Sequence, residues 1–565
     1  MSTTARPIRK GFINAGGGQI HFRAAGSGPP IILQHDSPRS SVLQIPQLEA
    51  FSDTFTAIAI DTPGYGNSTP LNLGRPLEIP DFGRALAEAV AGFGVERAPV
   101  YGVHTSSKIT LAFSAAHPER VAIAITDGLS MPATVDHAFI DAYMKPFVIE
   151  ESGGYLAAEW TRVLDFQTWF PWFTKSKATR QVRKAHNMQT LHEYSMDLFM
   201  AGPHFSDAYR AAMVFRPLPY IEKLKARTHI MCRQDDVLHG YLAALPDPLP
   251  AGCTKESVVP DREVWRNRLR ELFTEYTDWK GAAGFTPPDP FAASGTADRV
   301  LSSYVDVPGG QMLVRRTGDA KSGRPILFLH DLPGSARADE PLLMALAKAA
   351  GRPVYAFDLP GCNESSPATF ATGAGIIDAI HAGLGALKLD AVDVVATGLS
   401  TAFAVLLAAS HPGRVNRVLA DALFVADPSQ RTEMKVNYAP DLRPQRDGSH
   451  LHRCYHMLRA QELSWPWYDG SATAVRKIDP ELDAASLHIR LIDTLKQYAH
   501  FAEPILAACE IDVEGLLPKL GDKLIVAVRE DDVRYAAAAR STGQKITRPG
   551  PLGARADVFA KALSP

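Results

Sequence analysis

The chain of 565 residues contains one pattern of motifs twice, and this duplication limits the folds open to it. Asp-x-Pro-Gly occurs at 61–64 and 358–361, His-Asp-x-Pro at 35–38 and 330–333, and Arg-x-Asp-Asp-Val at 233–237 and 529–533. The motifs keep their order, and each second copy follows the first by about 295 residues. We predict two homologous domains, 1–280 and 298–565, joined by a linker at 281–297 that is rich in Gly, Pro and Ala.

Each half alternates short apolar runs with stretches of helical pattern. The runs lie at 31–34, 57–60, 100–103, 121–125 and 229–232, and again at 326–329, 354–357, 392–395, 415–419 and 524–528. Continuous apolar runs between helices are typical of buried parallel strands with crossover connections. The predicted fold class is therefore α/β, with a mostly parallel, doubly wound sheet in each half. In such sheets, functional side chains gather at the carboxyl ends of the strands.

The motifs resemble the α/β-hydrolase fold, present in tandem. The resemblance rests on the His-x-x-Pro loop, the Asp-x-Pro-Gly turn, the strand–turn–helix unit ending in His-Pro-x-Arg-Val, and an Asp after a late strand. It implies that each domain carries a helical cap insert, at about 130–225 and about 426–519. It also implies hydrolysis as the default reaction, although a fold alone assigns no function.

The first domain departs from the family at the position of the nucleophile. The family signature is G-x-S-x-G on a strained turn between a strand and a helix. Here the chain reads Gly102-Val103-His104-Thr105-Ser106, which puts His104 at the nucleophile position. Neither half has a His after its last strand, so neither carries a standard Ser-His-Asp triad.

The second domain allows two registers at this turn. An ungapped alignment of 95–118 with 389–412 sets His104 against Gly398 and Ser106 against Ser400. This register leaves the second domain without a side chain at the nucleophile position, and we favour it. The alternative makes Ser400 the nucleophile and shortens the following helix by two residues.

The position of the acid is filled in both halves, by Asp236 and Asp532. An imidazole reaches further from the backbone than a seryl oxygen, so His104 could bond to Asp236 directly. The carboxylate would fix the imidazole tautomer and raise the basicity of the other nitrogen. Our hypothesis is a dyad with His104 as general base, Asp236 as its partner and the backbone N–H of Thr105 as an oxyanion donor. Asp532 is interpreted as a brace of its loop.

Four further residues are candidates for the site. His35 and Asp36 lie in the loop of the His-x-x-Pro motif, where we interpret His35 as structural, because His330 repeats it, and Asp36 as able to orient a substrate. Ser106 either contacts substrate or caps the helix. His239 follows Asp236 and has no His counterpart in the second half.

Composition excludes several classes of protein. Lys and Arg number 59 against 61 Asp and Glu, which argues against a basic nucleic-acid binder. No apolar stretch is long enough to span a membrane. The five cysteines are scattered and predict neither a disulfide framework nor a zinc site. We expect a cytoplasmic protein with no cofactor, metal, nucleic acid or membrane partner, and a homo-oligomer remains an open alternative.

The first domain is therefore predicted to be an enzyme acting on a small organic molecule. The caps are rich in aromatic side chains, which favours an apolar or aromatic substrate; those of the first cap are Tyr155, Trp160, Trp169, Phe170, Trp172 and Phe173. The leading hypothesis is a hydrolase. One alternative is a lyase, decarboxylase or cofactor-free oxygenase that uses the same base, and another is a catalytically inactive ligand-binding protein.

Overall fold

The computed structural model describes residues 7–181, 186–277, 287–292, 298–319 and 322–564. The chain divides into two compact units. Unit 1 comprises 1–148, 162–186 and 193–292, and unit 2 comprises 149–161, 187–192 and 293–565. Two short segments of the first predicted cap are thus part of unit 2. Most of the predicted linker, 281–297, lies outside the described residues.

Unit 1 is built on an eight-stranded sheet with the order β1-β2-β4-β3-β5-β6-β7-β8. The strands are β1 (Arg9–Ala15), β2 (Gly18–Ala25), β3 (Pro30–Gln34), β4 (Thr56–Ile60), β5 (Ala98–Val103), β6 (Val121–Asp127), β7 (Thr228–Arg233) and β8 (Cys253–Val258). β2 is antiparallel to both of its neighbours, and β3 to β8 are parallel. Ile31, Ile32 and Leu33 of β3 are fully buried, as expected for a strand covered on both faces.

Unit 2 repeats this sheet strand for strand, in the order β9-β10-β12-β11-β13-β14-β15-β16. The strands are β9 (Leu301–Val307), β10 (Gly310–Thr317), β11 (Ile326–Leu329), β12 (Val354–Phe357), β13 (Val392–Thr397), β14 (Val415–Asp421), β15 (Leu524–Val528) and β16 (Gln544–Thr547). The predicted fold class, two mostly parallel sheets with helices, is confirmed.

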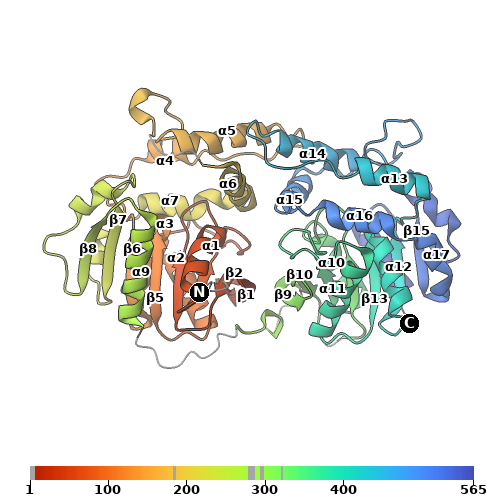
Figure 1. Ribbon diagram of the computed structural model, residues 1–565, viewed down its shortest axis with the longest axis horizontal. Helices are drawn as coiled ribbons and strands as arrows, with labels where there is room; N and C mark the ends of the chain where they lie inside the picture. The colour runs from red at the N-terminus through yellow and green to blue at the C-terminus, as the bar shows by residue number, and fades with distance from the viewer. Residues whose placement is uncertain (1–6, 182–185, 278–286, 293–297, 320–321, 565) are drawn as a thin grey trace. The chain divides into compact units, whose positions relative to one another are not determined.

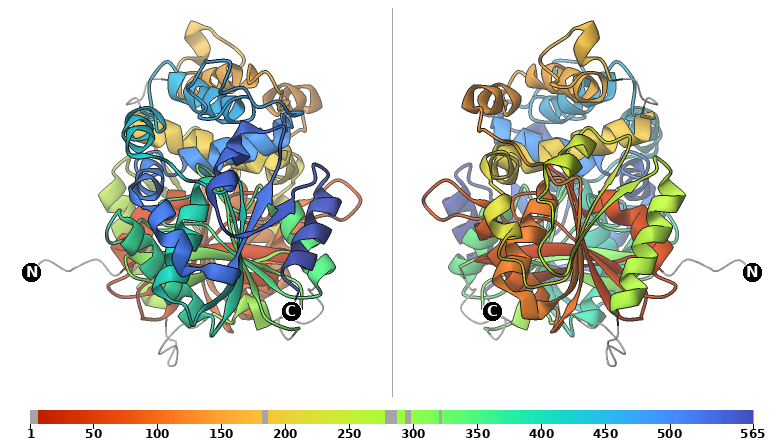
Figure 2. Two further views of the ribbon diagram at one scale, coloured as in Figure 1. Left: turned by 90° about the vertical axis from the view of Figure 1, so that its right-hand side faces the viewer. Right: turned by 90° about the vertical axis from the view of Figure 1, so that its left-hand side faces the viewer.

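Helices cover both faces of the unit 1 sheet (Figures 1 and 2). On one face, α1 (Ile45–Phe51) and α9 (Arg262–Tyr276) pack together, with the rings of Phe51 and Phe273 5.4 Å apart. α2 (Ile79–Gly92) and α3 (Thr105–Ala116) pack against each other on the opposite face. In unit 2 the scaffold helices are α10 (Glu340–Ala350), α11 (Gly373–Ala386), α12 (Thr401–Ser410) and α18 (Leu552–Ala562).

Further helices lie between the sixth and seventh strands of each sheet. Between β6 and β7 these are α4 (His137–Tyr143), α5 (Tyr155–Thr168), α6 (Met188–Ala201), α7 (Asp207–Val214) and α8 (Leu218–Ile221). Between β14 and β15 they are α13 (Pro428–Asn437), α14 (Ser449–Gln461), α15 (Ala484–Leu495), α16 (Ala502–Glu510) and α17 (Val513–Leu516). The division into units passes through α5 and α6, each of which begins in unit 2 and ends in unit 1.

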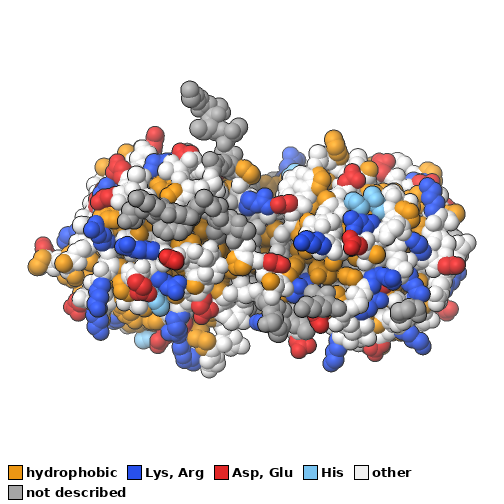
Figure 3. Space-filling view, turned by 90° about the horizontal axis from the view of Figure 1, so that it is seen from below, with side chains coloured by type: hydrophobic (Ala, Val, Ile, Leu, Met, Phe, Trp, Pro, Cys, Tyr) orange, Lys and Arg blue, Asp and Glu red, His pale blue; other side chains and the backbone are white. Residues whose placement is uncertain are grey.

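The surface is mixed in charge. Figure 3 shows Lys and Arg interspersed with Asp and Glu on the face that it draws. Among the described residues, no helix is long and apolar enough to cross a membrane.

Candidate functional site

The turn after β5 holds a residue other than glycine in a strained conformation. His104 has φ 50° and ψ −109° and stands between β5 and α3. Residues other than glycine rarely adopt a positive φ. Such backbone strain is concentrated at functional sites. Gly102 permits the tight turn, because a Cβ there would overlap the carbonyl oxygen of Ser106. The turn presents the His104 side chain at the carboxyl edge of the sheet.

A hydrogen bond joins the His104 imidazole to the Asp236 carboxylate. Asp236 lies in the loop after β7, with its Oδ2 2.8 Å from Nε2 of His104. Its Oδ1 accepts the backbone N–H of Leu238 at 2.9 Å. The His104 side chain is 31% exposed, and its Nδ1 makes no hydrogen bond within the part of the chain that the structure describes. Nδ1 is therefore available to a bound molecule while Nε2 is held.

The two side chains shift each other's pKa in opposite directions. Burial lowers the pKa of His104, but the hydrogen bond and charge of Asp236, helped by the charges of Asp36 and Asp127, raise it to about 9. Burial raises the pKa of Asp236, but the hydrogen bond and charge of His104 bring it below its ordinary value. At neutral pH the pair is therefore an imidazolium and a carboxylate.

Gly128 and Asp127, at the end of β6, fix the position of His104. A Cβ at Gly128 would lie 2.5 Å from Cδ2 of His104, so only glycine leaves room for the ring. The backbone carbonyl of Asp127 accepts the N–H of His104 at 2.9 Å. The Asp127 carboxylate is itself held by Tyr101 and Trp265, at 3.0 and 2.8 Å.

Our sequence reasoning missed the role of Gly128, although a signal for it exists. The register that sets His104 against Gly398 also sets Gly128 against Ala422. The first repeat thus has a large side chain at the turn and glycine after the next strand, and the second repeat has glycine at the turn and alanine after the next strand. A comparison of the repeats for such compensating pairs would have found the contact.

His35 has a structural role in the loop after β3. It is buried, its Nδ1 donates to the carbonyl of Asp36 at 2.7 Å, and its Nε2 accepts the N–H of Thr62 at 2.9 Å. His330 makes the corresponding two bonds in unit 2. Both ring nitrogens are therefore used by the scaffold.

Asp36 adds a second carboxylate near the dyad. Its Oδ1 is buried and has no hydrogen-bond partner among the described residues. Its negative charge contributes to the raised pKa of His104. Because a buried acceptor without a donor is unfavourable, a hydrogen-bond donor on a bound molecule would stabilise this oxygen.

The other predicted site residues are placed differently. Ser106 is fully buried, and its Oγ accepts the N–H of Val103 at 2.9 Å and donates to the Val103 carbonyl at 3.0 Å, so it braces the turn. Thr105 opens α3, where backbone N–H groups lack partners within the helix. His239 contacts Ser257 at 2.8 Å and is not brought to His104.

The corresponding turn of unit 2 carries no side chain. Gly398 has φ 55°, whereas Ser400 has φ −69° and ψ −12° and leads into α12. Ser400 is fully buried, and its Oγ donates to the carbonyl of His330. The strained position thus falls on Gly398, as in the ungapped register.

An ion pair fills the space at Gly398. The Asp331 carboxylate and the Arg534 guanidinium, which contact each other, both overlap the place where a Cβ would stand. Oδ1 of Asp331 accepts the N–H groups of Leu399 and Leu332 at 2.9 and 2.8 Å. In this fold, N–H groups at these two places receive a substrate oxyanion. Here the chain's own carboxylate occupies them.

Asp532 of unit 2 has an arginine partner in place of a histidine. Nε and Nη2 of Arg476 lie 3.1 Å from Oδ1 and 2.8 Å from Oδ2 of Asp532. Both side chains are buried. An arginine stays protonated at all ordinary pH values, so this pair offers no proton to a reaction. The partner differs from the one that a brace within the loop would use, because Arg529 bonds to Asp531 instead.

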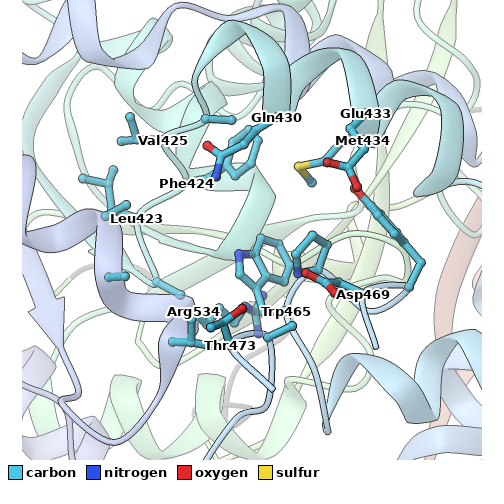
Figure 4. A pocket seen from close by; sticks show the side chains of 18 residues that line it. Leu423, Phe424, Val425, Gln430, Glu433, Met434, Trp465, Asp469, Thr473 and Arg534 are labelled. Carbon is cyan, nitrogen blue, oxygen red and sulfur yellow. The ribbon is translucent and has the colours of Figure 1, made fainter. Parts of the chain in front are cut away.

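Two cavities adjoin the Asp331–Arg534 pair. One, of about 470 Å³, extends over Gly398 and is lined by charged side chains of both signs. The other, of about 310 Å³, is drawn in Figure 4, where Trp465 stands between Arg534 and the carboxylate of Asp469. The Arg534 guanidinium lines both cavities and lies 5.0 Å from the Trp465 ring.

Comparison with known proteins identifies the fold. The family model described as alpha/beta hydrolase fold matches residues 324–447. A haloalkane dehalogenase of Mycobacterium tuberculosis is 30% identical over 116 residues, which are 20% of this chain and 40% of that protein. An Acinetobacter baylyi protein, (E)-2-((N-methylformamido)methylene)succinate hydrolase, is 30% identical over 101 residues, 18% of this chain and 38% of that protein. The chain thus spans about 40% of the length of these relatives.

Solved structures include similar folds. An epoxide hydrolase from Vigna radiata is 13% identical with a TM-score of 0.40, covering 49% of this chain and 100% of its own. An esterase from Thermogutta terrifontis is 17% identical with a TM-score of 0.37, covering 48% and 99%. With the family model and the two sheets described above, the chain consists of two tandem α/β-hydrolase-fold units, and its distant relatives include one named a dehalogenase and one named a hydrolase.

Replacing Asp236 with Asn should lower the pKa of His104 by at least about one unit. Burial, which lowers this pKa, remains in the variant, while the charge that raises it is lost. The measurement is a pH titration of the histidine ring signals by NMR, with His104→Gln to assign the signal. As a control, Asp235→Asn should leave the titration unchanged, because Asp235 is exposed and bonds to Arg233. Equal His104 titrations in wild type and Asp236→Asn would contradict the coupling.

Gly128→Ala should destabilise unit 1 by about 1–3 kcal/mol, through a positive φ and displacement of the imidazole. The matched variant, Ala422→Gly, relieves a φ of 59° and should be neutral or stabilising by about 1 kcal/mol. Denaturant unfolding, read by hydrogen exchange on β6 and β14, measures both. An equal loss of unfolding free energy in the two variants would contradict the interpretation that Gly128, unlike Ala422, must leave room for an imidazole.

Proposed function

We propose that unit 1 is an enzyme that acts on a small apolar or aromatic organic molecule, with His104 transferring a proton and Asp236 holding the imidazole. The observation that carries this proposal is the 2.8 Å contact of Nε2 with Oδ2 at the strained turn. A side chain held in a costly backbone conformation, bonded to a carboxylate and open at its second nitrogen, has the elements of a general acid–base group.

Hydrolysis of an ester, amide or related carbonyl bond is the reaction that we favour. In its neutral form His104 would take a proton from water through Nδ1, and the resulting hydroxide would attack the carbonyl carbon. The N–H of Thr105, which has no partner within α3, would donate to the carbonyl oxygen as negative charge develops there. The protonated Nδ1 would then donate to the leaving group, which returns the base to its starting state. The name of one distant relative, a succinate-derivative hydrolase of Acinetobacter baylyi, supports this class.

The preference for an aromatic substrate rests on the cap side chains of unit 1. Around Tyr143 gather the rings of Phe139, Phe166, Phe170, Phe173 and Tyr209. Burial raises the pKa of Tyr209, and the charge of Asp36 adds to the rise, which links this cluster electrostatically to the site. Tyr155 and Trp160 instead contact His488 and His450 within unit 2. An aromatic wall beside a few polar groups is typical of sites for small organic ligands.

A second candidate function is proton abstraction without hydrolysis, as in a lyase, a decarboxylase or a cofactor-free oxygenase. The specific observation in its favour is the buried Oδ1 of Asp36, which lacks a donor within the described residues. A carboxylate beside the turn opposes the build-up of an oxyanion but accepts an N–H or O–H from a substrate. Such a contact would orient an acidic substrate toward His104.

Removal of His104 distinguishes an enzyme from a binding protein. We expect His104→Ala to lower kcat/KM by at least about 100-fold, because it removes the acid–base group. The assay is turnover of a panel of p-nitrophenyl and phenyl esters and aromatic formamides, with calorimetric binding of the same compounds to wild type and to His104→Ala. Ser400→Ala serves as control and should leave turnover unchanged. If unit 1 only binds ligands, wild type shows no turnover while binding persists in His104→Ala.

The pH profile of kcat/KM tests the role of the imidazole. If His104 acts as a base in the rate-limiting step, kcat/KM rises with pH up to about 9, where the imidazolium loses its proton. If it acts first as an acid, kcat/KM falls above the same pH. Asp236→Asn should move the midpoint to lower pH, while His239→Gln, which alters a histidine bonded to Ser257, should leave it in place. A profile that is flat from pH 6 to 10 would overturn the proposal.

A further inference from the structure

Two pieces of the first cap pack within unit 2. We call residues 149–161 and 187–192 the docked segment, since contacts group them with 293–565. Tyr455 donates its hydroxyl to the carbonyl of Glu151 at 2.8 Å. Further side-chain bonds join Trp160 to Arg446, Arg459 to Glu151, and Tyr498 to Gln189. The docked segment is thus held by several directional contacts.

These contacts occur in reciprocal pairs. A Cβ at Gly153 of the docked segment would lie 2.7 Å from the Tyr455 ring, and a Cβ at Gly448 would lie 2.7 Å from the Trp160 ring. Gly153 and Gly448 are equivalent in the two repeats, and so are Trp160 and Tyr455, each pair being 295 positions apart. Each glycine therefore receives the aromatic ring of the other repeat.

Two buried hydrogen bonds between the repeats show the same reciprocal pattern. The Tyr155 hydroxyl is 2.6 Å from Nδ1 of His488, and Nε2 of His450 is 3.4 Å from Nδ1 of His192. Tyr155 is equivalent to His450, and His192 to His488, within one position of the same spacing. A surface in which residue i contacts j′ while i′ contacts j is the pattern of an isologous dimer interface. Here both partners belong to one chain.

A chain of neutral histidines forms one half of this contact. The N–H of Gln445 donates to Nδ1 of His450 at 3.1 Å, so His450 carries its proton on Nε2 and donates to His192. His192 in turn donates from Nε2 to the carbonyl of Leu495 at 3.0 Å. The two histidines are 2% and 0% exposed. An added proton on either ring would lose an acceptor and bury a charge.

The surroundings do not compensate such a charge. Burial lowers the pKa of His192 to about 4 and that of His450 to about 3. The charged groups that act on His450 are Asp447 and Arg453, which oppose each other. The remaining faces of the pair meet the uncharged rings of Trp160 and Tyr498. Docking is therefore complete above the ordinary histidine pKa of about 6.5 and weakens as the pH falls below it.

Helix α6 connects the histidines to the loop after β3. His192 lies in its first turns, and Asp197 follows five residues later. The Asp197 carboxylate binds Nε of Arg39 at 2.8 Å and the hydroxyl of Ser40 at 2.6 Å. This loop begins with Asp36, whose charge acts on His104. The helix α6 thus contains both His192 of the docked segment and Asp197, which binds the loop 36–40.

We propose that unit 2 functions as a docking platform for the first cap, through a dimer-like set of exchanged contacts, and that protonation of the His192–His450 pair releases the docked segment and loosens the loop 36–40. The degenerate repeat would then regulate its partner in response to acid without any chemistry of its own. This inference does not depend on the reaction of His104, and its test needs no substrate.

Hydrogen exchange of the full chain, read by mass spectrometry at pH 7.5 and 5.0, tests the proposal. Exchange rates are corrected for pH. If a histidine takes up a proton only in the released state, the equilibrium constant for docking falls by about 30-fold at pH 5.0. Peptides from the docked segment and from 36–40 should therefore exchange at least about tenfold faster at pH 5.0, while β5 and β13 keep their protection. Unchanged protection of the docked segment would overturn the acid release, and release without a response at 36–40 would overturn the transmission through α6.

A pair of histidine variants assigns the acid response. The double variant His192→Gln and His450→Gln keeps a donor near each Nε2 but cannot take up a proton, so its docked segment should respond to pH at least about tenfold less than wild type. His452→Gln, on the same helix α14, is the matched control and should respond as wild type does. A full acid response in the double variant would overturn the assignment to this pair.

A pair of glycine variants tests the reciprocity and remains informative if the double variant is unstable. Gly153→Ala and Gly448→Ala each place a methyl group against an aromatic ring of the other repeat. Both should release the docked segment at pH 7.5, although they lie in different repeats. Gly521→Ala, at φ 50° with open space around its Cβ, carries the backbone strain alone and should leave the docked segment protected. Release by only one of the two variants would overturn the exchanged interface.

Discussion

The strained turn at the end of β5 and β13 is the constraint on which the rest of the architecture depends. The turn has φ near 50° in both units, at His104 and at Gly398. It directs one side-chain position toward the carboxyl edge of the sheet, and the neighbouring strand leaves space there for a single group. Where that group is an imidazole, the next strand must end in Gly128. Where the turn carries glycine, as at Gly398, the side chains of Asp331 and Arg534 fill the space.

The same backbone therefore supports two different electrostatic arrangements. In unit 1, the His104 imidazole is hydrogen-bonded to the Asp236 carboxylate, and an imidazole can gain or lose a proton. In unit 2, the charges opposite Asp331 and Asp532 belong to arginines, which do not titrate at ordinary pH. The backbone N–H groups of unit 2 also have a partner within the chain, because those of Leu399 and Leu332 donate to the Asp331 carboxylate. Unit 2 thus has fixed ion pairs where unit 1 has a histidine and a carboxylate.

Part of this could be predicted from the sequence because it depends on local pattern. Apolar runs identify the parallel strands, and the ungapped register of the repeats separates His104 from Gly398. Spacing after the seventh strand identifies Asp236. These features lie within short stretches whose periodicity or order is visible in the chain.

The remainder depends on contacts between residues distant in sequence. The ring of His104 over Gly128 requires knowledge that β5 and β6 are adjacent, and the Arg476–Asp532 pair joins a cap insert to a strand end. The sequence also offers no boundary at residue 162 or 193, because α5 and α6 continue through the points where the chain passes from unit 2 to unit 1. Helical periodicity describes an element without telling which partner it packs against.

The exchanged contacts of the docked segment give a physical reason for what the two copies share. A glycine that accommodates the ring of the other repeat cannot gain a side chain unless that ring moves, so each copy constrains the other at Gly153 and Gly448. The bonds at the turn show no such reciprocal pattern, because His104 bonds to Asp236 in unit 1 and Asp331 bonds to Leu399 in unit 2. The two copies therefore differ at the strained turn, where one has His104 and the other Gly398, and match at the two glycines that receive aromatic rings.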